Sequence, residues 1–170
     1  ILHDSARALE EITVTGSRIQ GSGMSTSTPV TAVSNAELRS MAPTTVIEGL
    51  VQLPQFLNND TPQSQSYSSS GPAGASRINL RGIGTQRTLI LLNGRRLVPS
   101  TRTGEVNIAL LPETLIRRVD IVTGGASAAY GSDAVSGVVN FILDSEYTGL
   151  GGTVEGGVTG LGDNPSHEAG

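Results

Sequence analysis

Cysteine, tryptophan and lysine are absent from this 170-residue chain, and all eleven of its cationic side chains are arginine. Without cysteine the chain can form no disulfide and no thiolate metal site. Its two histidines, His3 and His167, lie in the terminal stretches, where neither is placed for general-base or zinc chemistry. The absence of cysteine suits proteins of the bacterial envelope and many cytosolic ones equally, so composition does not decide the compartment.

Long apolar runs and basic clusters are missing as well. No segment approaches the roughly 18 consecutive apolar residues of a membrane-spanning helix. The formal net charge is −4, and without lysine or a basic run the chain has little to offer a phosphate backbone. Nucleic acid is therefore excluded as a partner.

The sequence also lacks a catalytic constellation. The segment around Ser127 has one glycine of a nucleophile elbow but not the second, and no histidine is placed to activate it. Residues 82–84 begin a Gly-x-Gly pattern that lacks its third glycine and leads into a strand. Asp120, Asp133 and Asp144 are spread through strands and turns, and Asp133 is predicted to cap a short helix. We therefore expect no enzyme activity, no metal site and no cofactor.

What the chain has instead is glycine, 22 residues of it, with valine, isoleucine and leucine to build a core. Residues 119–122 and 138–143 are apolar, β-branched runs that predict two strands. The small-residue segment between them has glycines at its corners and room for two short helical turns. Residues 116–143 thus predict a strand–turn–short helix–turn–strand unit onto which the preceding elements pack.

Short strands and helices precede this unit. Residues 29–33 predict a strand, and the Ser-x-x-Glu and Thr-x-x-Glu spacings at 34–37 and 45–48 each predict the start of a capped helix. The second helix is amphipathic and needs a sheet to lie on. The fold class is therefore predicted to be α+β, a small mixed β-sheet with short helices.

The middle of the chain predicts further strands. Residues 77–80 alternate between apolar and polar side chains, and the apolar run 88–92 predicts a strand covered on both faces. Asn93-Gly94 is the strongest hairpin signal in the chain, and residues 96–98 return from it as a short strand.

Polar segments separate these elements. Residues 58–76 and 99–106 are either simply solvated loops or functional ones. Residues 11–15 (EITVT) predict a strand within a linker-like stretch that continues through 17–28. That strand either pairs with a strand of this chain or adds to a β-sheet of another protein.

The composition and pattern of the sequence change after residue 143. Residues 150–161 are glycine-rich and alternating, which predicts a strand in a different sheet, and no element is predicted for 164–170. The predicted organisation is a tail and linker at 1–28, a domain at 29–145 and the start of a second structure at 146–170.

Four motifs in order then carry a family likeness: EITVTG at 11–16, LRGIG at 80–84, LLNGRRL at 91–97 and VDIVTGGASAAYGSDAVSGVVNFI at 119–142. Together they strongly resemble the plug domain of TonB-dependent outer-membrane receptors. The resemblance implies a plug lodged inside the receptor's own β-barrel in the outer membrane, with its N-terminus facing the periplasm. It implies a gate that occludes the barrel and couples substrate binding to TonB.

The resemblance also implies partners and residues. The TonB box, which binds the TonB C-terminal domain by adding a strand, would be Glu11, Ile12, Thr13, Val14 and Thr15. Loops 58–76, 84–87 and 99–106 would face a small-molecule substrate such as an iron chelate, cobalamin or a glycan. The candidates there are Tyr67, Gln86, Arg87 and Arg102, each of which would otherwise be merely solvated.

Arg81 matches the arginine of the family's Leu-Arg-Gly motif, which pairs with barrel acids. Thr123 stands where many members have a second arginine, so the ionic contact between plug and barrel would either have fewer charges or be carried partly by Arg117 or Arg118. A barrel of this class needs about 22 strands of ~10 residues, so residues 150–161 would be its first strand at most. The alternative is a free-standing periplasmic ligand-binding module.

Overall fold

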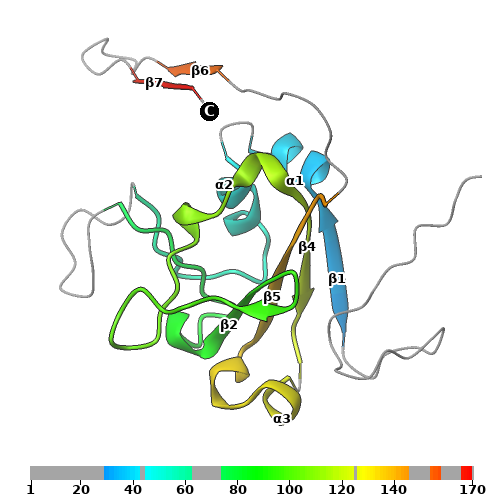
Figure 1. Ribbon diagram of the computed structural model, residues 1–170. Helices are drawn as coiled ribbons and strands as arrows, with labels where there is room; N and C mark the ends of the chain where they lie inside the picture. The colour runs from blue at the N-terminus through cyan, green and yellow to red at the C-terminus, as the bar shows by residue number, and fades with distance from the viewer. Residues whose placement is uncertain are drawn as a thin grey trace, which may run out of the picture.

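The fold is seen in a computed structural model that describes residues 29–42, 45–62, 74–124, 126–145, 154–157 and 166–169. One mixed sheet has the strand order β1-β4-β5-β2-β3 (Figure 1). Strand β5 runs parallel to β2, whereas the other neighbouring pairs are antiparallel. The strands are β1 Val30–Ser34, β2 Thr88–Leu92, β3 Arg95–Arg96, β4 Ile116–Val122 and β5 Gly137–Leu143. The predicted α+β class with a small mixed sheet is confirmed.

The helices are short, and two of them begin at the predicted caps. Ser34 Oγ accepts the Glu37 backbone N–H at 3.3 Å, and Thr45 Oγ1 accepts that of Glu48 at 3.0 Å. The helices are α1 Asn35–Met41, α2 Val46–Val51 and α3 Ser127–Tyr130, with 3₁₀ turns η1 Thr85–Arg87, η2 Ile108–Leu110, η3 Glu113–Leu115 and η4 Ser132–Ala134.

The core lies on both faces of the sheet. On one face α1 and α2 pack against the sheet, and the buried residues include Leu38, Val46, Leu50, Val119, Ile121 and Phe141. The other face carries a smaller cluster of Leu89, Leu91, Val122, Ala126, Ala134 and Val138, beneath the segment that contains α3 and η4. Strands β2, β4 and β5 each contribute residues to both clusters, so the centre of the sheet is enclosed on both faces.

Three local predictions were wrong. Strand β3 is Arg95–Arg96 and not residues 96–98, because its pairing with β2 follows directly from the Asn93-Gly94 turn. Residues 77–80 form two isolated bridges, Asp60 with Arg77 and Phe56 with Leu80, and are not a strand of the sheet. Asp133 pairs with Arg96, at 2.5 Å between Oδ2 and Nη1, and does not cap η4.

Part of the C-terminal region forms a separate two-stranded antiparallel sheet. It consists of β6 Val154–Gly157, inside the predicted strand 150–161, and β7 Ser166–Ala169, which the sequence did not predict. The SHEA sequence of β7 contains no β-branched residue, so propensity gave no signal there. The predicted strand 11–15 and linker 17–28 lie outside the described residues. Within the described ranges, no helix has both the length and the apolar character needed to cross a bilayer.

A substitution at Gly137 tests how closely β5 packs on β4. A Cβ at this position would lie 2.1 Å from the Val122 carbonyl oxygen, and its φ of +139° favours glycine. We expect Gly137→Ala to lower the free energy of unfolding by about 3 kcal/mol or more, measured by urea denaturation.

Gly124→Ala is the matched control, because a Cβ there meets Pro29 Cδ at an ordinary 3.6 Å. Gly124→Ala should lower the free energy of unfolding by less than about 1 kcal/mol. Equal losses in the two variants would contradict the close packing of β5 on β4.

Candidate functional site

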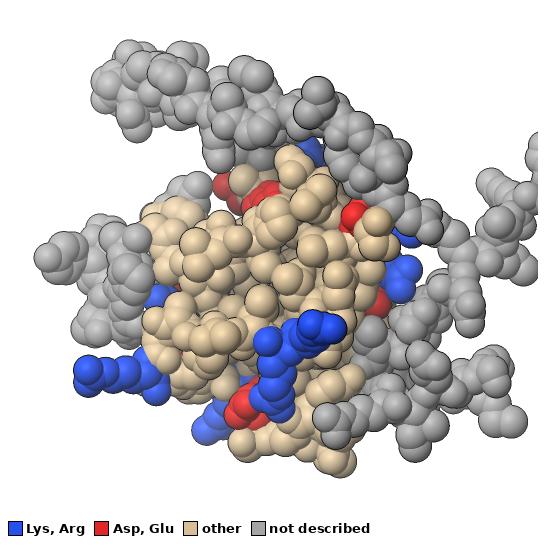
Figure 2. Space-filling model, in the orientation of Figure 1, with Lys and Arg blue, Asp and Glu red and all other residues tan. Residues whose placement is uncertain are grey.

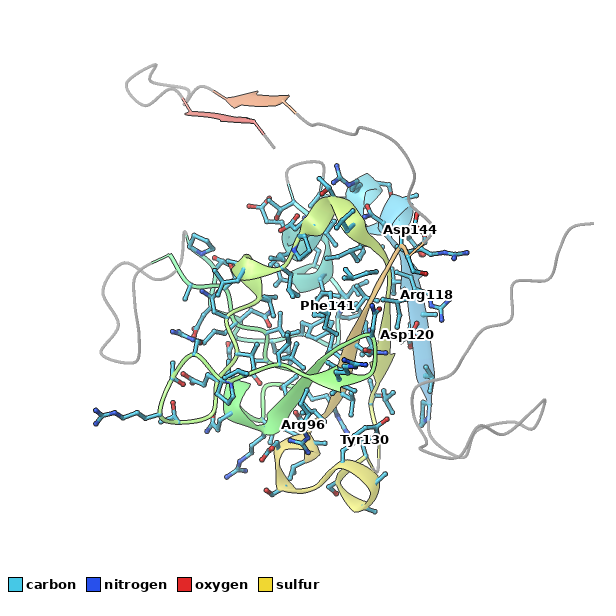
Figure 3. All side chains as sticks on the ribbon, viewed as in Figure 1. Arg96, Arg118, Asp120, Tyr130, Phe141 and Asp144 are labelled. Atoms are coloured by element: carbon cyan, nitrogen blue, oxygen red, sulfur yellow. The ribbon has the colours of Figure 1, made fainter. Side chains whose placement is uncertain are left out.

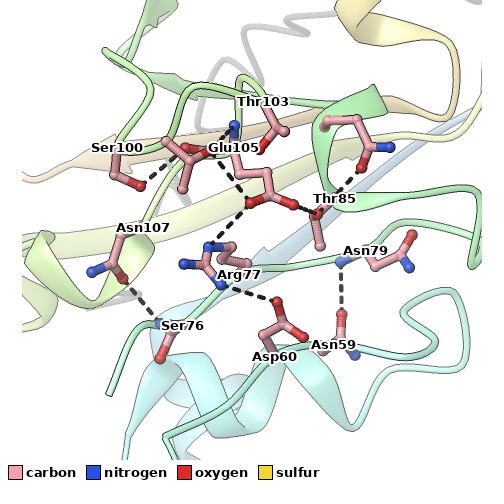
Figure 4. Close-up of polar contacts among 12 residues, drawn as sticks. Asn59, Asp60, Ser76, Arg77, Asn79, Thr85, Ser100, Thr103, Glu105 and Asn107 are labelled. Atoms are coloured by element: carbon pink, nitrogen blue, oxygen red, sulfur yellow. Dashed lines mark hydrogen bonds and ion pairs between the residues drawn. The ribbon is translucent and has the colours of Figure 1, made fainter. Parts of the chain in front are cut away.

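Two of the predicted substrate-facing loops meet in the structure. Gln86 and Arg87 are exposed in η1, and Arg102 is exposed in the loop that follows β3. The two loops are joined by Glu105, because Thr85 Oγ1 donates to its Oε1 at 2.7 Å (Figure 4). Tyr67, the fourth predicted residue, lies outside the described residues.

Glu105 also organises its own loop. Thr101 Oγ1 donates to Glu105 Oε2 at 3.3 Å and accepts the Glu105 backbone N–H at 3.1 Å. The carbonyl oxygen of Glu105 accepts from the backbone N–H of Ser100 at 2.8 Å and from its hydroxyl at 3.0 Å. The Glu105 side chain is 11% exposed, so its carboxylate makes these bonds largely out of water.

Beneath this loop lies Arg77, which is 1% exposed. Its Nη1 donates to Asp60 Oδ2 at 3.2 Å, and its Nε lies 3.7 Å from Glu105 Oε2 (Figure 4). The backbones of Asp60 and Arg77 also exchange two hydrogen bonds, at 2.9 and 2.8 Å. A buried guanidinium is tolerated when carboxylates balance its charge, and here two do so.

Sequence reasoning missed Arg77 and Glu105. Alternation placed Arg77 on the polar side of a strand, and polar loops favour an exposed glutamate. Their partners come from loops far apart along the chain, so no spacing pattern marks the cluster.

Hydrogen bonds from side chains also fix the turn between residues 80 and 88. Thr88 Oγ1 accepts the backbone N–H of Leu80 at 3.1 Å, in a buried position. Ser136 Oγ, just before β5, donates to the carbonyl oxygen of Arg87 at 2.6 Å. The turn that presents Gln86 and Arg87 is therefore attached to the centre of the sheet.

Arg81 is exposed and has a φ of +63°. Its Nη1 donates to the carbonyl oxygen of Thr123 at 2.9 Å, and its backbone N–H donates to Gln55 O at 2.7 Å. Thr123, the residue that stands in place of a second arginine, thus supplies a backbone acceptor for the first. This bond holds the Arg81 guanidinium against the end of β4.

The other predicted barrel-contact residues lie on β4. Arg117 is exposed at the irregularity between Ile116 and Arg118. Arg118 is partly buried, and its Nε lies 3.0 Å from Oδ1 of Asp120, which is buried (Figure 3). Asp120 therefore balances the charge of Arg118 within the domain. A contact with the barrel would favour an arginine whose charge is not already paired.

Cationic side chains also lie on the surface of the domain. Figure 2 shows several of them in the lower part of the visible face and others at its right-hand edge. Among them Arg96 pairs with Asp133 and donates to the carbonyl oxygen of Tyr130, which fixes β3 to the small-residue segment (Figure 3). The described residues contain no group of three or more histidine, aspartate or glutamate side chains that could hold a metal ion.

Comparison with known families decides the identity of this architecture. The model of the TonB-dependent receptor plug domain matches residues 22–138, more than half of the chain. The chain belongs to the TonB-dependent receptor plug domain family. The match contains strands β1 to β4 and the start of β5, together with η1 and the Glu105 loop.

Solved receptors share the plug fold. A variant of the ferric enterobactin receptor PfeA from Pseudomonas aeruginosa matches with 27% identity and a TM-score of 0.51, over 69% of this chain and 18% of the receptor. The ferric yersiniabactin uptake receptor FyuA from Yersinia pestis matches with 25% identity and a TM-score of 0.51, over 77% of this chain and 19% of the receptor. The siderophore receptor PirA from Acinetobacter baumannii, 24% identical, matches with a TM-score of 0.52 over 74% of this chain and 18% of the receptor. The plug chain thus spans less than a fifth of each receptor.

Thr88 tests how the plug holds η1. Thr88→Val keeps the shape of the side chain but removes the acceptor of the buried Leu80 N–H. We expect a loss of about 1 to 3 kcal/mol in the free energy of unfolding, measured by urea denaturation. Thr31→Val, at an exposed position of the edge strand β1, is the control. Its free energy of unfolding should stay within about 0.5 kcal/mol of the wild-type value. If both variants unfold at the wild-type urea concentration, the hydroxyl does not hold the turn.

Proposed function

We propose that this domain is the gate and energy-coupling module of a TonB-dependent outer-membrane transporter. The family match across the sheet is the observation that carries the proposal, because it covers both the fold and the elements that present the candidate residues. Plug domains of these receptors are components of transport systems, and we infer that this one is not an enzyme. The barrel that it would occlude belongs to the remaining four fifths of such receptors.

Coupling to TonB would run through residues 11–15. Their alternating, β-prone sequence suits strand addition, in which backbone hydrogen bonds supply much of the affinity. The tether 17–28 leads directly to β1, an edge strand that is paired with β4 in the described sheet. A pull on the tether would therefore reach the fold at an edge strand.

Proline at Val14 tests strand addition. Val14→Pro removes a backbone donor and disfavours an interior strand position, so binding of the purified TonB C-terminal domain should fall below detection. The measurement is isothermal titration calorimetry on this chain. Ser22→Pro, in the linker, is the control and should leave the affinity unchanged. An unchanged affinity for Val14→Pro would rule out the strand-addition mechanism.

The proposed location is the outer membrane, with the plug inside the barrel and its N-terminus toward the periplasm. The proposed parts are the TonB box and linker at 1–28, the plug at 29–145 and the beginning of the barrel at 146–170, where β6 would belong to the first barrel strand. Arg81 and Arg117 are the plug–barrel contacts that their exposure supports best, and Arg118 contributes less because it pairs with Asp120.

A ferric chelate is the substrate class we propose, over cobalamin and glycans. PfeA and FyuA, which share the plug fold at 25% identity or more, are receptors for ferric enterobactin and ferric yersiniabactin. Arg87 and Arg102 would present positive charge to an anionic chelate, with Gln86 next to Arg87 in η1. Tyr67 stays a candidate from the sequence alone. No feature of the described residues favours a free-standing periplasmic module.

Removing that charge tests the substrate-facing assignment. In a receptor that carries this plug, the Arg87→Ala/Arg102→Ala double variant should raise the dissociation constant of the imported ferric chelate about tenfold, because two attractive charges are lost. Fluorescence quenching on ligand addition measures the constant. Arg39→Ala on α1, whose Nε bonds to Asn35, is the control and should not change it. Equal effects of the two changes would contradict the assignment.

A further inference from the structure

The ion cluster Asp60–Arg77–Glu105, in which Arg77 is buried and Asp60 partly exposed, lies where the three proposed substrate-facing loops begin or end. Residues 61–76 leave from Asp60 and return at Arg77, η1 begins at Thr85, and the third loop closes at Glu105 (Figure 4). These loops are separate in sequence, and the cluster connects them in space.

Glu105 joins two of the loops through different oxygens. Its Oε1 accepts from Thr85, the residue before Gln86, while its Oε2 accepts from Thr101, the residue before Arg102. One carboxylate thus holds the neighbours of two candidate binding residues. A displacement of either loop breaks a hydrogen bond to a nearly buried charge, which is more costly than losing one in water.

Arg77 adds the remaining loop. Its ion pair with Asp60 and the two backbone bonds between these residues close the base of loop 61–76. The same guanidinium faces Glu105 through Nε. The base of that loop and the Glu105 carboxylate therefore share one cation.

The chemistry of the cluster argues for a positional role. A buried ion pair gains little stability over an apolar replacement of the same volume, because desolvation offsets the attraction. Among the described residues, Nε and Nη2 of Arg77 have no hydrogen-bond partner, so the site is not optimised for stability either. The charges instead fix the orientation of the side chains, because each carboxylate must face the guanidinium.

We propose that Arg77 and Glu105 are positioning residues that set the placement of η1 and the Glu105 loop relative to each other and to the Asp60–Arg77 pair. η1 and the Glu105 loop are then preorganised from below, by one buried cation and one carboxylate. That these loops receive substrate rests on the proposed function; that the cluster couples them does not.

The absence of cysteine allows a direct test on this chain. Spin labels at Gln86→Cys and Arg102→Cys, both exposed, report the distance distribution between η1 and the Glu105 loop by double electron–electron resonance. Thr85→Val removes the hydroxyl that joins η1 to Glu105 and leaves the buried charges paired. The distribution should be narrow in the parent and become about twofold wider in Thr85→Val, as one loop is released.

Thr103→Val is the matched control, because this exposed hydroxyl bonds to Thr101 in its own loop. Its distribution should match that of the parent. Glu105→Gln, which keeps the shape of the side chain but removes its charge toward Arg77, should widen the distribution as Thr85→Val does. Circular dichroism verifies that each variant is folded.

A parent-like width in both Thr85→Val and Glu105→Gln overturns the proposal, and so does equal widening in Thr103→Val, which would show general loosening of the loop. None of these measurements involves TonB, a barrel or a substrate. The proposal can therefore fail while strand addition by residues 11–15 holds, and the reverse is equally possible.

Discussion

Strand β5 is hydrogen-bonded to β4 on one side and to β2 on the other, and residues 137–141 are buried. This enclosure depends on Gly137, where the chain comes so close to the Val122 carbonyl oxygen that a side chain has no room. Surface features are attached to the same strand. Ser136, just before β5, holds η1 through the Arg87 carbonyl oxygen, and Asn140 Oδ1 accepts the Gly94 N–H of the β2–β3 turn.

Charges divide into two groups around this centre. The charges of Arg77 and Arg118 are paired inside the domain with Asp60, Glu105 and Asp120. Arg81, Arg87 and Arg102 are exposed. An interior built from valine, isoleucine and leucine gives the internal pairs few alternatives, so each one fixes a particular loop or strand. The exposed group is then available for a barrel wall or an anionic ligand, as the proposed function requires.

Much of this fold could be predicted from the sequence because its signals are local. The Ser34 and Thr45 caps, the Asn93-Gly94 turn and the β-branched runs of β4 and β5 each act within a few residues. The Arg77–Glu105 cluster could not be predicted, since it depends on how loops distant in sequence meet. Asp133 shows the same limit. Its position predicted a local capping role, but its side chain pairs with Arg96 on β3.

The central claim is that this domain closes a barrel, and single-channel conductance tests it most directly. A receptor that carries this plug is inserted into a planar lipid bilayer, either intact or with residues 29–145 deleted. The intact receptor should conduct almost no ions, and the deleted form should open a large, stable channel. Equal conductance of the two forms, with both barrels shown to be folded, would contradict the role of this domain as a gate.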